Sequence, residues 1–298
     1  MNQITKPMLA ETLTDMASLT FPVLCTPKLD GFRCLKIKGK ALTRKFLPVR
    51  NKFVREWIEA NCPDGVDGEL MLRSGNFNET ASAIGKESGT PDFVFYVFDF
   101  VRCAEPFGEN IKQPYEQRMA ALQSLPLLDR CQKILPVQIG NTAELEAYEA
   151  KCLAAGYEGV MIRKPSGPYK CGRSTEAEGY LLKLKRFADA EAVVVSTYEG
   201  MTNNNEATVD ALGHTKRSSA KAGKVGRGEL GGFVVRMASG VEFKLGYNHT
   251  YGKDRATMWN QRETLVGKTV KFKYQPSGMK DAPRFPSFLG FREDWDMD

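Results

Sequence analysis

The chain has 298 residues, 42% of them hydrophobic, and a formal net charge of +6 at pH 7. This length can bury a full core in one or two domains, and the modest positive charge suits an acidic partner such as nucleic acid. Seven cysteines without metal-like spacing exclude a disulfide framework, and no apolar run approaches the roughly 20 residues of a membrane helix. We therefore expect a cytoplasmic, soluble protein with reduced thiols and no membrane partner.

The first two thirds of the chain mix strands and helices. In chain order, the pattern predicts strands at 23–26 and 32–37, a turn at 38–40, a helix at 50–60, a strand at 93–101 and a helix from 141 to 156. Asn141 opens the last helix, because Glu144 follows it at the spacing of a capping box. The strand at 93–101 is aromatic and β-branched, which is typical of a buried strand, and Asp99 is the charged residue within it.

The last third is mostly β. Strands are predicted at 192–198, 233–237, 241–245 and 269–274, with one helix at 255–265. Short strands with an inserted helix indicate a small barrel of the OB type, which commonly binds nucleic acid. The character of the sequence changes near 188–189, and we place a domain boundary there.

The segment 201–228 is long, basic and rich in Asn, Ser, Gly and Ala. Its cations are Lys216, Arg217, Lys221, Lys224 and Arg227, and no acidic residue follows Asp210 within it. A connection of this length inside a compact domain is usually functional or disordered. We expect it to lack a core-forming pattern and to become ordered on DNA.

The most informative motif is Lys-Leu-Asp-Gly-Phe-Arg at 28–33. Lysine attacks phosphorus as the free amine, and neighbouring cations favour that form. Such cations occur downstream at Arg163, Lys183 and Lys185, and they also suit the neutralisation of phosphate charge. Lys-x-Asp-Gly alone is typical of a charged turn, but the ordered set predicts covalent nucleotide transfer.

Two further features support an anion site. Lys183 and Lys185 have a spacing of two, so on a strand both side chains point to the same face. Two lysines directed inward are costly unless an anion lies between them, which predicts a buried phosphate. Glu69 and Glu158 add the hard oxygen atoms that hold a divalent ion against phosphates.

This set of motifs resembles that of the covalent nucleotidyltransferases, which comprise ATP-dependent DNA ligases, RNA ligases and mRNA capping enzymes. It is most similar to the short viral DNA ligases, and the resemblance extends nearly from end to end. The matching segments are 4–7, 21–22, 28–33, 67–69, 158–163, 172–175, 183–185, 271–274 and 283–286.

The resemblance implies an α+β fold, in which a mixed α/β nucleotidyltransferase domain (1–188), an ATP-grasp-like adenylation domain, precedes an OB-fold β-barrel (189–298). It implies ATP-dependent sealing of nicks in duplex DNA, between a 3′-hydroxyl and a 5′-phosphate, through a lysyl-AMP intermediate and a DNA-adenylate. ATP and Mg²⁺ or Mn²⁺ would be the cofactors. A monomer would encircle the nicked duplex, with the segment 201–228 closing around it.

The resemblance also assigns roles to individual residues. Catalysis falls to Lys28, Asp30, Lys183 and Lys185. Nucleotide contacts fall to Thr26, Arg33, Glu69, Phe98, Arg173, Lys183, Lys185 and Arg284, with Phe98 stacking on adenine. Metal ligation falls to Glu69 and Glu158. DNA contacts fall to Arg33 and Arg44, which clamp the 5′-phosphate, and to Lys216, Arg217, Lys221, Lys224 and Arg227.

One departure from the family pattern lies near the C-terminus. Longer ligases end a pyrophosphate-orienting motif with Arg-x-Asp-Lys, whereas this chain has Trp295 in place of the lysine. Lys271 and Lys273 are candidates for its role. A capping guanylyltransferase or RNA ligase remains an alternative, because these enzymes share Lys-x-Asp-Gly. A non-catalytic DNA-binding protein is a second alternative, although the inward charges argue against it.

Overall fold

A computed structural model describes residues 4–75, 77–104, 108–126, 129–209, 215–247, 255–276, 279 and 281–292. The chain divides into two compact units, Met1–Lys185 and Arg186–Asp298. The predicted boundary after residue 188 lies close to this division. Within the described ranges, none of the helices has the length and apolar character that a membrane crossing requires.

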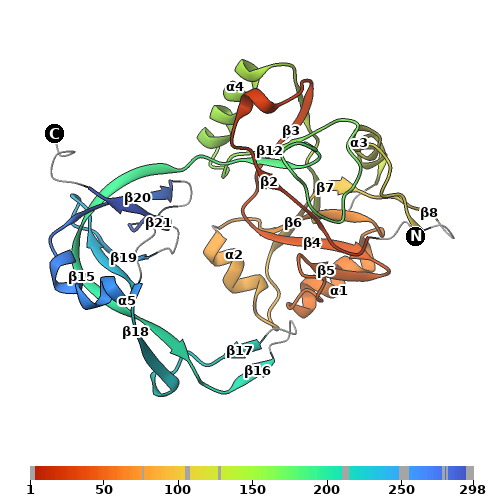
Figure 1. Ribbon diagram of the computed structural model, residues 1–298. Coiled ribbons are helices and arrows are strands. Elements are labelled where there is room, and N and C mark those ends of the chain that lie inside the picture. The colour runs from red at the N-terminus through yellow and green to blue at the C-terminus, as the bar shows by residue number, and fades with distance from the viewer. Residues whose placement is uncertain are drawn as a thin grey trace. The chain divides into compact units, whose positions relative to one another are not determined.

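The first unit contains two five-stranded sheets (Figure 1). The first has the order β10-β7-β6-β4-β5, with β10 and β7 parallel and the other neighbours antiparallel. Its strands are β4 (Phe32–Ile37), β5 (Lys40–Thr43), β6 (Val66–Leu72), β7 (Phe93–Phe100) and β10 (Cys131–Lys133). The predicted strand at 32–37 is confirmed with the same ends, and the one predicted at 93–101 ends one residue earlier.

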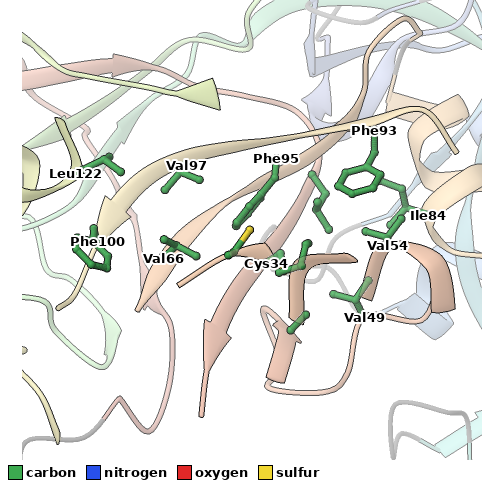
Figure 2. Packing of buried hydrophobic residues seen from close by; sticks show 14 of the residues in the cluster. Cys34, Val49, Val54, Val66, Ile84, Phe93, Phe95, Val97, Phe100 and Leu122 are labelled. Atoms are coloured by element: carbon green, nitrogen blue, oxygen red, sulfur yellow. The ribbon is translucent and has the colours of Figure 1, made fainter. Parts of the chain in front are cut away.

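Both faces of β4 are buried. Side chains alternate along a strand, so Cys34 packs into one hydrophobic cluster while Leu35 and Ile37 pack into another. The first cluster includes residues of α1 (Lys52–Asn61), α2 (Phe77–Ile84) and α3 (Tyr115–Ser124). Figure 2 shows Phe95 above Cys34 and Phe93 beside Ile84 in this cluster. The strand that follows the Lys28 motif is therefore fixed on both sides.

The helix predicted at 50–60 is observed as α1. It begins after Asn51, whose Oδ1 accepts a hydrogen bond from Val54 N–H at 3.0 Å. The rings of Phe53 and Trp57 meet the Phe93 ring edge-on, with centroids 6.2 and 5.6 Å away. The predicted apolar face of this helix thus packs on β7.

The second sheet of the first unit has the order β11-β3-β12-β14-β2. Its strands are β2 (Glu11–Thr12), β3 (Val23–Pro27), β11 (Val137–Ile139), β12 (Val160–Arg163) and β14 (Leu182–Leu184). Helix α4 (Thr142–Ala154) adds Leu145 and Cys152 to the core of this sheet. The predicted helix cap is confirmed, because Asn141 Oδ1 accepts a hydrogen bond from Glu144 N–H at 2.9 Å.

Short elements complete the first unit. They are β1 (Met8–Leu9), which pairs in parallel with β13 (Gly172–Arg173), the pair β8 (Cys103–Ala104) and β9 (Gly108–Glu109), and a 3-10 turn at Met16–Ser18. A further cluster combines Leu35 of the first sheet with Met8, Tyr169 and Leu181. Ile4 and Met8 are therefore part of the core of this unit.

The second unit is built on one antiparallel sheet of order β19-β18-β15-β20-β21. Its strands are β15 (Ala188–Asn203), β18 (Lys224–Arg236), β19 (Glu242–Gly246), β20 (Thr269–Gln275) and β21 (Arg284–Phe291). Phe233, Phe272 and Phe288 fill its core. In the described residues β19 and β21 are the sheet edges, so backbone pairing does not close a barrel. The helix predicted at 255–265 is divided into α5 (Arg255–Asn260) and a 3-10 turn, Arg262–Leu265.

The segment 201–228 was expected to become ordered only on DNA, but its described residues form paired strands in the protein alone. β15 and β18 remain paired in this segment, from Met201 with Gly226 to Asn203 with Lys224, and β16 (Ala207–Val209) pairs with β17 (Thr215–Arg217) beyond them (Figure 1). We call the described residues of 201–228 the ribbon. Asn205 Nδ2 donates to Ser218 O and Ala220 O, each at 2.9 Å. Strand pairing and hydrogen bonds from Asn side chains satisfy the backbone N–H and C=O groups without a hydrophobic core. The pattern of apolar residues therefore did not predict these strands. Residues 210–214 lie outside the described ranges.

Candidate active site

Lys28 lies in the turn between β3 and β4. Its N–H donates to Gly159 O at 2.9 Å, and Glu158 N–H donates to Lys28 O at 3.2 Å. Gly31 is required in this turn, since a Cβ there would lie 2.4 Å from Leu70 O of β6. The motif is therefore pinned to the segment that precedes β12 and packed closely against β6.

Glu158 joins Lys28 to Lys185. Glu158 Oε2 accepts a hydrogen bond from Lys28 Nζ, and Glu158 Oε1 accepts one from Lys185 Nζ at 3.3 Å. The Glu158 side chain is 4% exposed, whereas that of Lys28 is 22% exposed. Pairing with two ammonium groups offsets the cost of burying the carboxylate. Lys28 remains open to a small molecule from solvent.

Gly159 brings these residues together. Its φ is +147°, and a Cβ at this position would lie 2.2 Å from Leu184 O. Only glycine permits this conformation and this approach of the start of β12 to the end of β14. Glu158 and Lys185 flank the two strands at this contact, which is why they meet.

Lys183 and Arg173 add positive charge. Burial and the charges of Arg173, Lys28 and Lys185 lower the pKa of Lys183, against an opposing effect of Glu11. Within the described ranges Lys183 forms no ion pair. The inward lysine pair predicted from the sequence is thus half-buried beside a carboxylate and an arginine. Such an excess of cations is what a phosphate anion requires.

Glu69 is half-buried on β6, where it pairs in register with Arg33. Burial raises the pKa of the Glu69 carboxyl to about 7, although Arg33, Lys28 and a hydrogen bond from Gly31 N–H favour its ionised form. A carboxylate whose negative charge is only partly compensated inside the protein is stabilised when it binds a further cation. Its interaction with Lys28 places Glu69 at the same site.

Glu69 and Glu158 are therefore the carboxylates that could hold a divalent ion beside Lys28. The described residues contain no group of three or more His, Cys, Asp or Glu side chains that would form a preassembled metal site. Mg²⁺ usually binds through one or two carboxylates together with substrate phosphates and water. The donor set fits the ion, provided that a phosphate supplies further oxygen atoms.

Arg33 is held by Asp67. Its Nε and Nη2 both bond the Asp67 carboxylate, the latter at 2.5 Å. The guanidinium carbon lies 4.7 Å from the centroid of the Phe98 ring. Arg33 thus covers one face of Phe98, and a stacked base would have to use the other face.

The remaining predicted residues of the first unit differ in exposure. Thr26 is buried in β3, opposite Met161 of β12, and Asp30 is half-buried in the Lys28 turn. Arg44 is exposed in the turn after β5. Among the described residues no acidic group pairs with Arg44, so its guanidinium is available to a phosphate.

The candidates for pyrophosphate contacts belong to the second unit. The Arg284 guanidinium lies 4.9 Å from the centroid of the Phe285 ring. Lys271 Nζ pairs with Asp189 Oδ2 at 3.1 Å, and Lys273 Nζ lies over the ring of Phe187. The position of Trp295 lies outside the described residues.

The predicted DNA-binding cations are carried by the ribbon. Arg217, Lys221 and Arg227 are exposed, and Lys224 is half-buried. Arg217 donates to Asn205 O, and Arg227 Nη2 pairs with Glu229 Oε2 at 2.6 Å. The side chain of Lys216, on β17, lies outside the described residues.

A buried ion cluster of the first unit was not predicted. Asp99 Oδ1 accepts a hydrogen bond from Arg118 Nε, and Oδ2 accepts one from Arg163 Nη1, each at 2.8 Å. Burial opposes ionisation of Asp99, but the two arginines lower its pKa. The sequence signal was a lone charge in an apolar strand. Arg163, expected at the phosphate site, is committed to this cluster.

Two family models match the chain. The model described as ATP dependent DNA ligase domain covers residues 7–185, and that described as DNA ligase OB-like domain covers residues 222–292. These matches confirm the predicted order of a nucleotidyltransferase domain and an OB-type domain.

Individual proteins show the same relationship. A crystal structure of Chlorella virus DNA ligase-adenylate is 34% identical, with 98% of this chain and 99% of that chain covered and a TM-score of 0.56. A probable DNA ligase of Sorangium cellulosum is 25% identical over 96% of this chain and 55% of its own length. A DNA ligase of African swine fever virus is 26% identical over 45% of this chain and 32% of its own length. The chain thus spans about half the length, or less, of these two relatives.

The resemblance inferred from the motifs is confirmed by both kinds of comparison. The ligase domain model extends over more than half of the chain, and the Chlorella virus structure aligns with nearly all of it. This protein therefore belongs to the family of ATP-dependent DNA ligases.

Proposed function

We propose that this protein seals nicks in duplex DNA by transferring AMP through Lys28. The observation that carries the proposal is the convergence of Lys28 and Lys185 on Glu158, with Lys183 close to both lysines, within the unit that matches the ligase domain model. A lysine that is accessible and close to other cations suits attack on a phosphorus atom, because those cations favour its free amine.

The first step uses ATP as a substrate. Lys28 Nζ first loses a proton to solvent and then attacks the α-phosphorus as the free amine. The new P–N bond replaces the P–O bond to pyrophosphate, which leaves, and the nitrogen releases a second proton to solvent. Lys183 and Lys185 neutralise negative charge on the phosphate, and Arg173 adds a further cation beside Lys183. Adenine stacks on the face of Phe98 that Arg33 leaves free.

A divalent ion, Mg²⁺ or Mn²⁺, would be held by Glu69 and Glu158 and would neutralise charge on the phosphates. Thr26, at the end of β3, and Arg284, from the second unit, complete the proposed nucleotide contacts. Arg284, with Lys271 and Lys273, would orient the pyrophosphate.

The second and third steps act on DNA. The nick 5′-phosphate attacks the lysyl-AMP, which forms a DNA-adenylate, and the 3′-hydroxyl then displaces AMP. Arg33 and Arg44 clamp the 5′-phosphate, since a guanidinium binds phosphate oxygens through two donors. Asp30, in the same turn as Lys28, assists the attack of the 3′-hydroxyl.

The ribbon of the second unit supplies the proposed grip on the duplex. Its cations would contact backbone phosphates on a protein that acts as a monomer and closes around the nick. The cytoplasmic location expected from the sequence stays a prediction.

The test is sealing of a nicked duplex that carries a 5′-phosphate, with ATP and Mg²⁺. We expect sealing, and a protein adduct of AMP in the absence of DNA. GTP, a 5′-hydroxyl nick, a chelator and a nick in RNA serve as comparison arms. Labelling by GTP in place of ATP would support a capping guanylyltransferase, and sealing confined to RNA would support an RNA ligase. Loss of both adduct and sealing would leave only the DNA-binding alternative.

A further inference from the structure

Arg33 is backed by a buried chain of hydrogen bonds that ends at Tyr169. Tyr169 and Asp67 are each 1% exposed, and Met8 is fully buried. The three residues come from distant parts of the chain: the N-terminal strand β1, the strand β6 and the segment between β12 and β13.

The polar atoms of this hydrogen-bond network each have a defined partner. Tyr169 Oη donates to Asp67 Oδ2 at 2.7 Å and accepts a hydrogen bond from Met8 N–H at 3.2 Å. Asp67 Oδ2 also accepts from Arg33 Nη2 at 2.5 Å, and Arg33 Nη2 approaches Met8 O at 3.4 Å. The hydroxyl of Tyr169 therefore fixes the same carboxylate oxygen that receives the guanidinium.

These hydrogen bonds determine the orientation of the Arg33 guanidinium group. The carboxylate of Asp67 can rotate about its side-chain bonds unless a second group holds it. With Tyr169 in place, Asp67 presents both oxygen atoms to Arg33, and the guanidinium lies against Phe98. Functional groups need such support, because small losses of orientation weaken charge-assisted contacts.

We propose that Tyr169 is a positioning residue, whose hydroxyl aligns Arg33 through Asp67 for contact with the 5′-phosphate of the nick. This inference rests on the proposed function, in which Arg33 and Arg44 clamp that phosphate. Tyr169 does not contact the substrate in this scheme. Because Arg33 contacts the 5′-phosphate directly in this scheme but makes only one of several nucleotide contacts, the loss should fall on AMP transfer to DNA far more than on the attack of Lys28 on ATP.

The test compares two buried tyrosines. Tyr169→Phe removes the hydroxyl but keeps the ring that packs with Met8 and Leu181. Tyr115→Phe is the matched control, because Tyr115 is equally buried and its ring lies under Arg163, and because the hydroxyl that bonds Asp67 is that of Tyr169. Both proteins are first charged with AMP and then mixed with nicked DNA in a single turnover.

We expect Tyr169→Phe to slow AMP transfer to the nick by roughly tenfold, the effect of one lost hydrogen bond to a charged group. Its rate of adenylylation by ATP should stay within about twofold of the wild type, as should both rates of Tyr115→Phe. Unchanged transfer in Tyr169→Phe would overturn the proposal. Equal losses in adenylylation and transfer, or equal losses in both tyrosine variants, would also overturn it, since they indicate a purely structural role.

A double-mutant cycle separates positioning from stability. Arg33→Lys keeps a cation beside the buried Asp67 but lacks the planar fork, so there is no fork for Tyr169 to align. In the Arg33→Lys background, Tyr169→Phe should change the transfer rate by less than about twofold. A full tenfold loss in that background would exclude action through Arg33. Failure of the proposed function has a different signature, because the wild-type protein itself would then form no AMP adduct and seal no nick.

Discussion

The first unit and the ribbon of the second unit use charge in opposite ways. In the first unit Glu158, Asp67 and Asp99 are each at most 5% exposed and each pairs with arginine or lysine. The ribbon carries Arg217, Lys221 and Arg227 on exposed positions. Arg217 bonds a backbone oxygen atom, and Arg227 pairs with the neighbouring Glu229.

Buried and exposed charges suit different tasks, which are catalysis in the first unit and DNA binding in the ribbon. A buried ion pair costs desolvation energy, so its geometry is fixed and its loss affects a specific step or the fold. An exposed charge costs little to maintain and acts at a distance that salt screens. We therefore expect large, specific effects from the first unit and graded, salt-dependent effects from the ribbon.

The largest expected effect is that of Lys28→Ala. The variant should form no AMP adduct and should seal a nick only when the DNA is already adenylylated, because the later steps do not need the lysine amine. Lys38→Ala, in the exposed turn after β4, is the control and should behave as the wild type. Mass spectrometry after incubation with ATP checks both proteins. An AMP adduct on the Lys28→Ala protein would show that another residue is the nucleophile.

A second comparison concerns two aspartates that each bridge two arginines. Asp99, between Arg118 and Arg163, is fully buried, whereas Asp92, between Arg73 and Arg130, has a side chain that is 63% exposed. Asp99→Asn should lower the free energy of unfolding by about 3–5 kcal/mol, because it leaves buried cations without their partner. Asp92→Asn should cost no more than about 1 kcal/mol. Denaturant unfolding at neutral pH measures both, and equal costs would contradict the assignment of the difference to burial.

The Asp99 cluster also predicts a pH dependence. The folded-state pKa of Asp99 is lowered, so its stabilisation is fully present above the unfolded value near 3.8 and is lost as pH falls through the folded value. The difference in unfolding free energy between wild type and Asp99→Asn should therefore shrink as the solution is acidified below that value. A constant difference down to strongly acidic pH would mean that the charge of Asp99 is not what stabilises the cluster.

The fourth prediction separates the two steps of the reaction within the first unit. If Arg44 clamps the nick 5′-phosphate, Arg44→Ala should retain adenylylation of Lys28 but slow AMP transfer to DNA. Loss of one bidentate, charge-assisted contact costs about 1.5–3 kcal/mol, or roughly tenfold to hundredfold in rate. Arg50→Ala removes another exposed arginine of the same region and should leave both steps unchanged. An equal loss in the ATP-dependent step would assign Arg44 to the nucleotide pocket instead.

The sequence marked the residues of the candidate site by type and spacing. Lys28, Glu158, Lys183 and Lys185 could be recognised because their residue types and spacing carry the chemistry. The convergence of Lys28, Glu158 and Lys185 is seen in the structure. The role of Tyr169 could not be predicted, because the contact with Asp67 joins residues that are 102 positions apart. The contact of Asp99 with Arg118 was missed for another reason, because α3, which carries Arg118, lacks a clear apolar stripe.

The main error in the fold also has a physical cause. Periodicity detects strands that bury one face, and the described residues of 201–228 form strands without a buried face. Their stability comes from backbone pairing and from Asn side chains such as Asn203 and Asn205, which have no periodic signature. The sequence therefore set the basic, polar segment 201–228 apart from the rest of the second unit, but the expectation that it becomes ordered only on DNA missed its strands.

The ribbon should give the smallest effect per residue. Each phosphate contact releases about one counterion, so removing one contact should lower the slope of log affinity against log salt by about 1. The triple change Lys221→Ala, Lys224→Ala and Arg227→Ala should weaken binding of nicked DNA at low salt and flatten its salt dependence, while Lys28 still takes AMP from ATP.

The control must remove the same charge from the same unit. Arg236→Ala, Lys244→Ala and Lys268→Ala do so at exposed positions outside the ribbon, and this variant should retain most of the salt slope. DNA affinity across a salt series compares the three proteins. Because net charge falls equally in both triple variants, a flatter slope in the ribbon variant alone must come from local phosphate contacts. Equal slopes in both variants would mean that the ribbon acts only through the general field of the protein, and the grip on the duplex would then have to come from another surface.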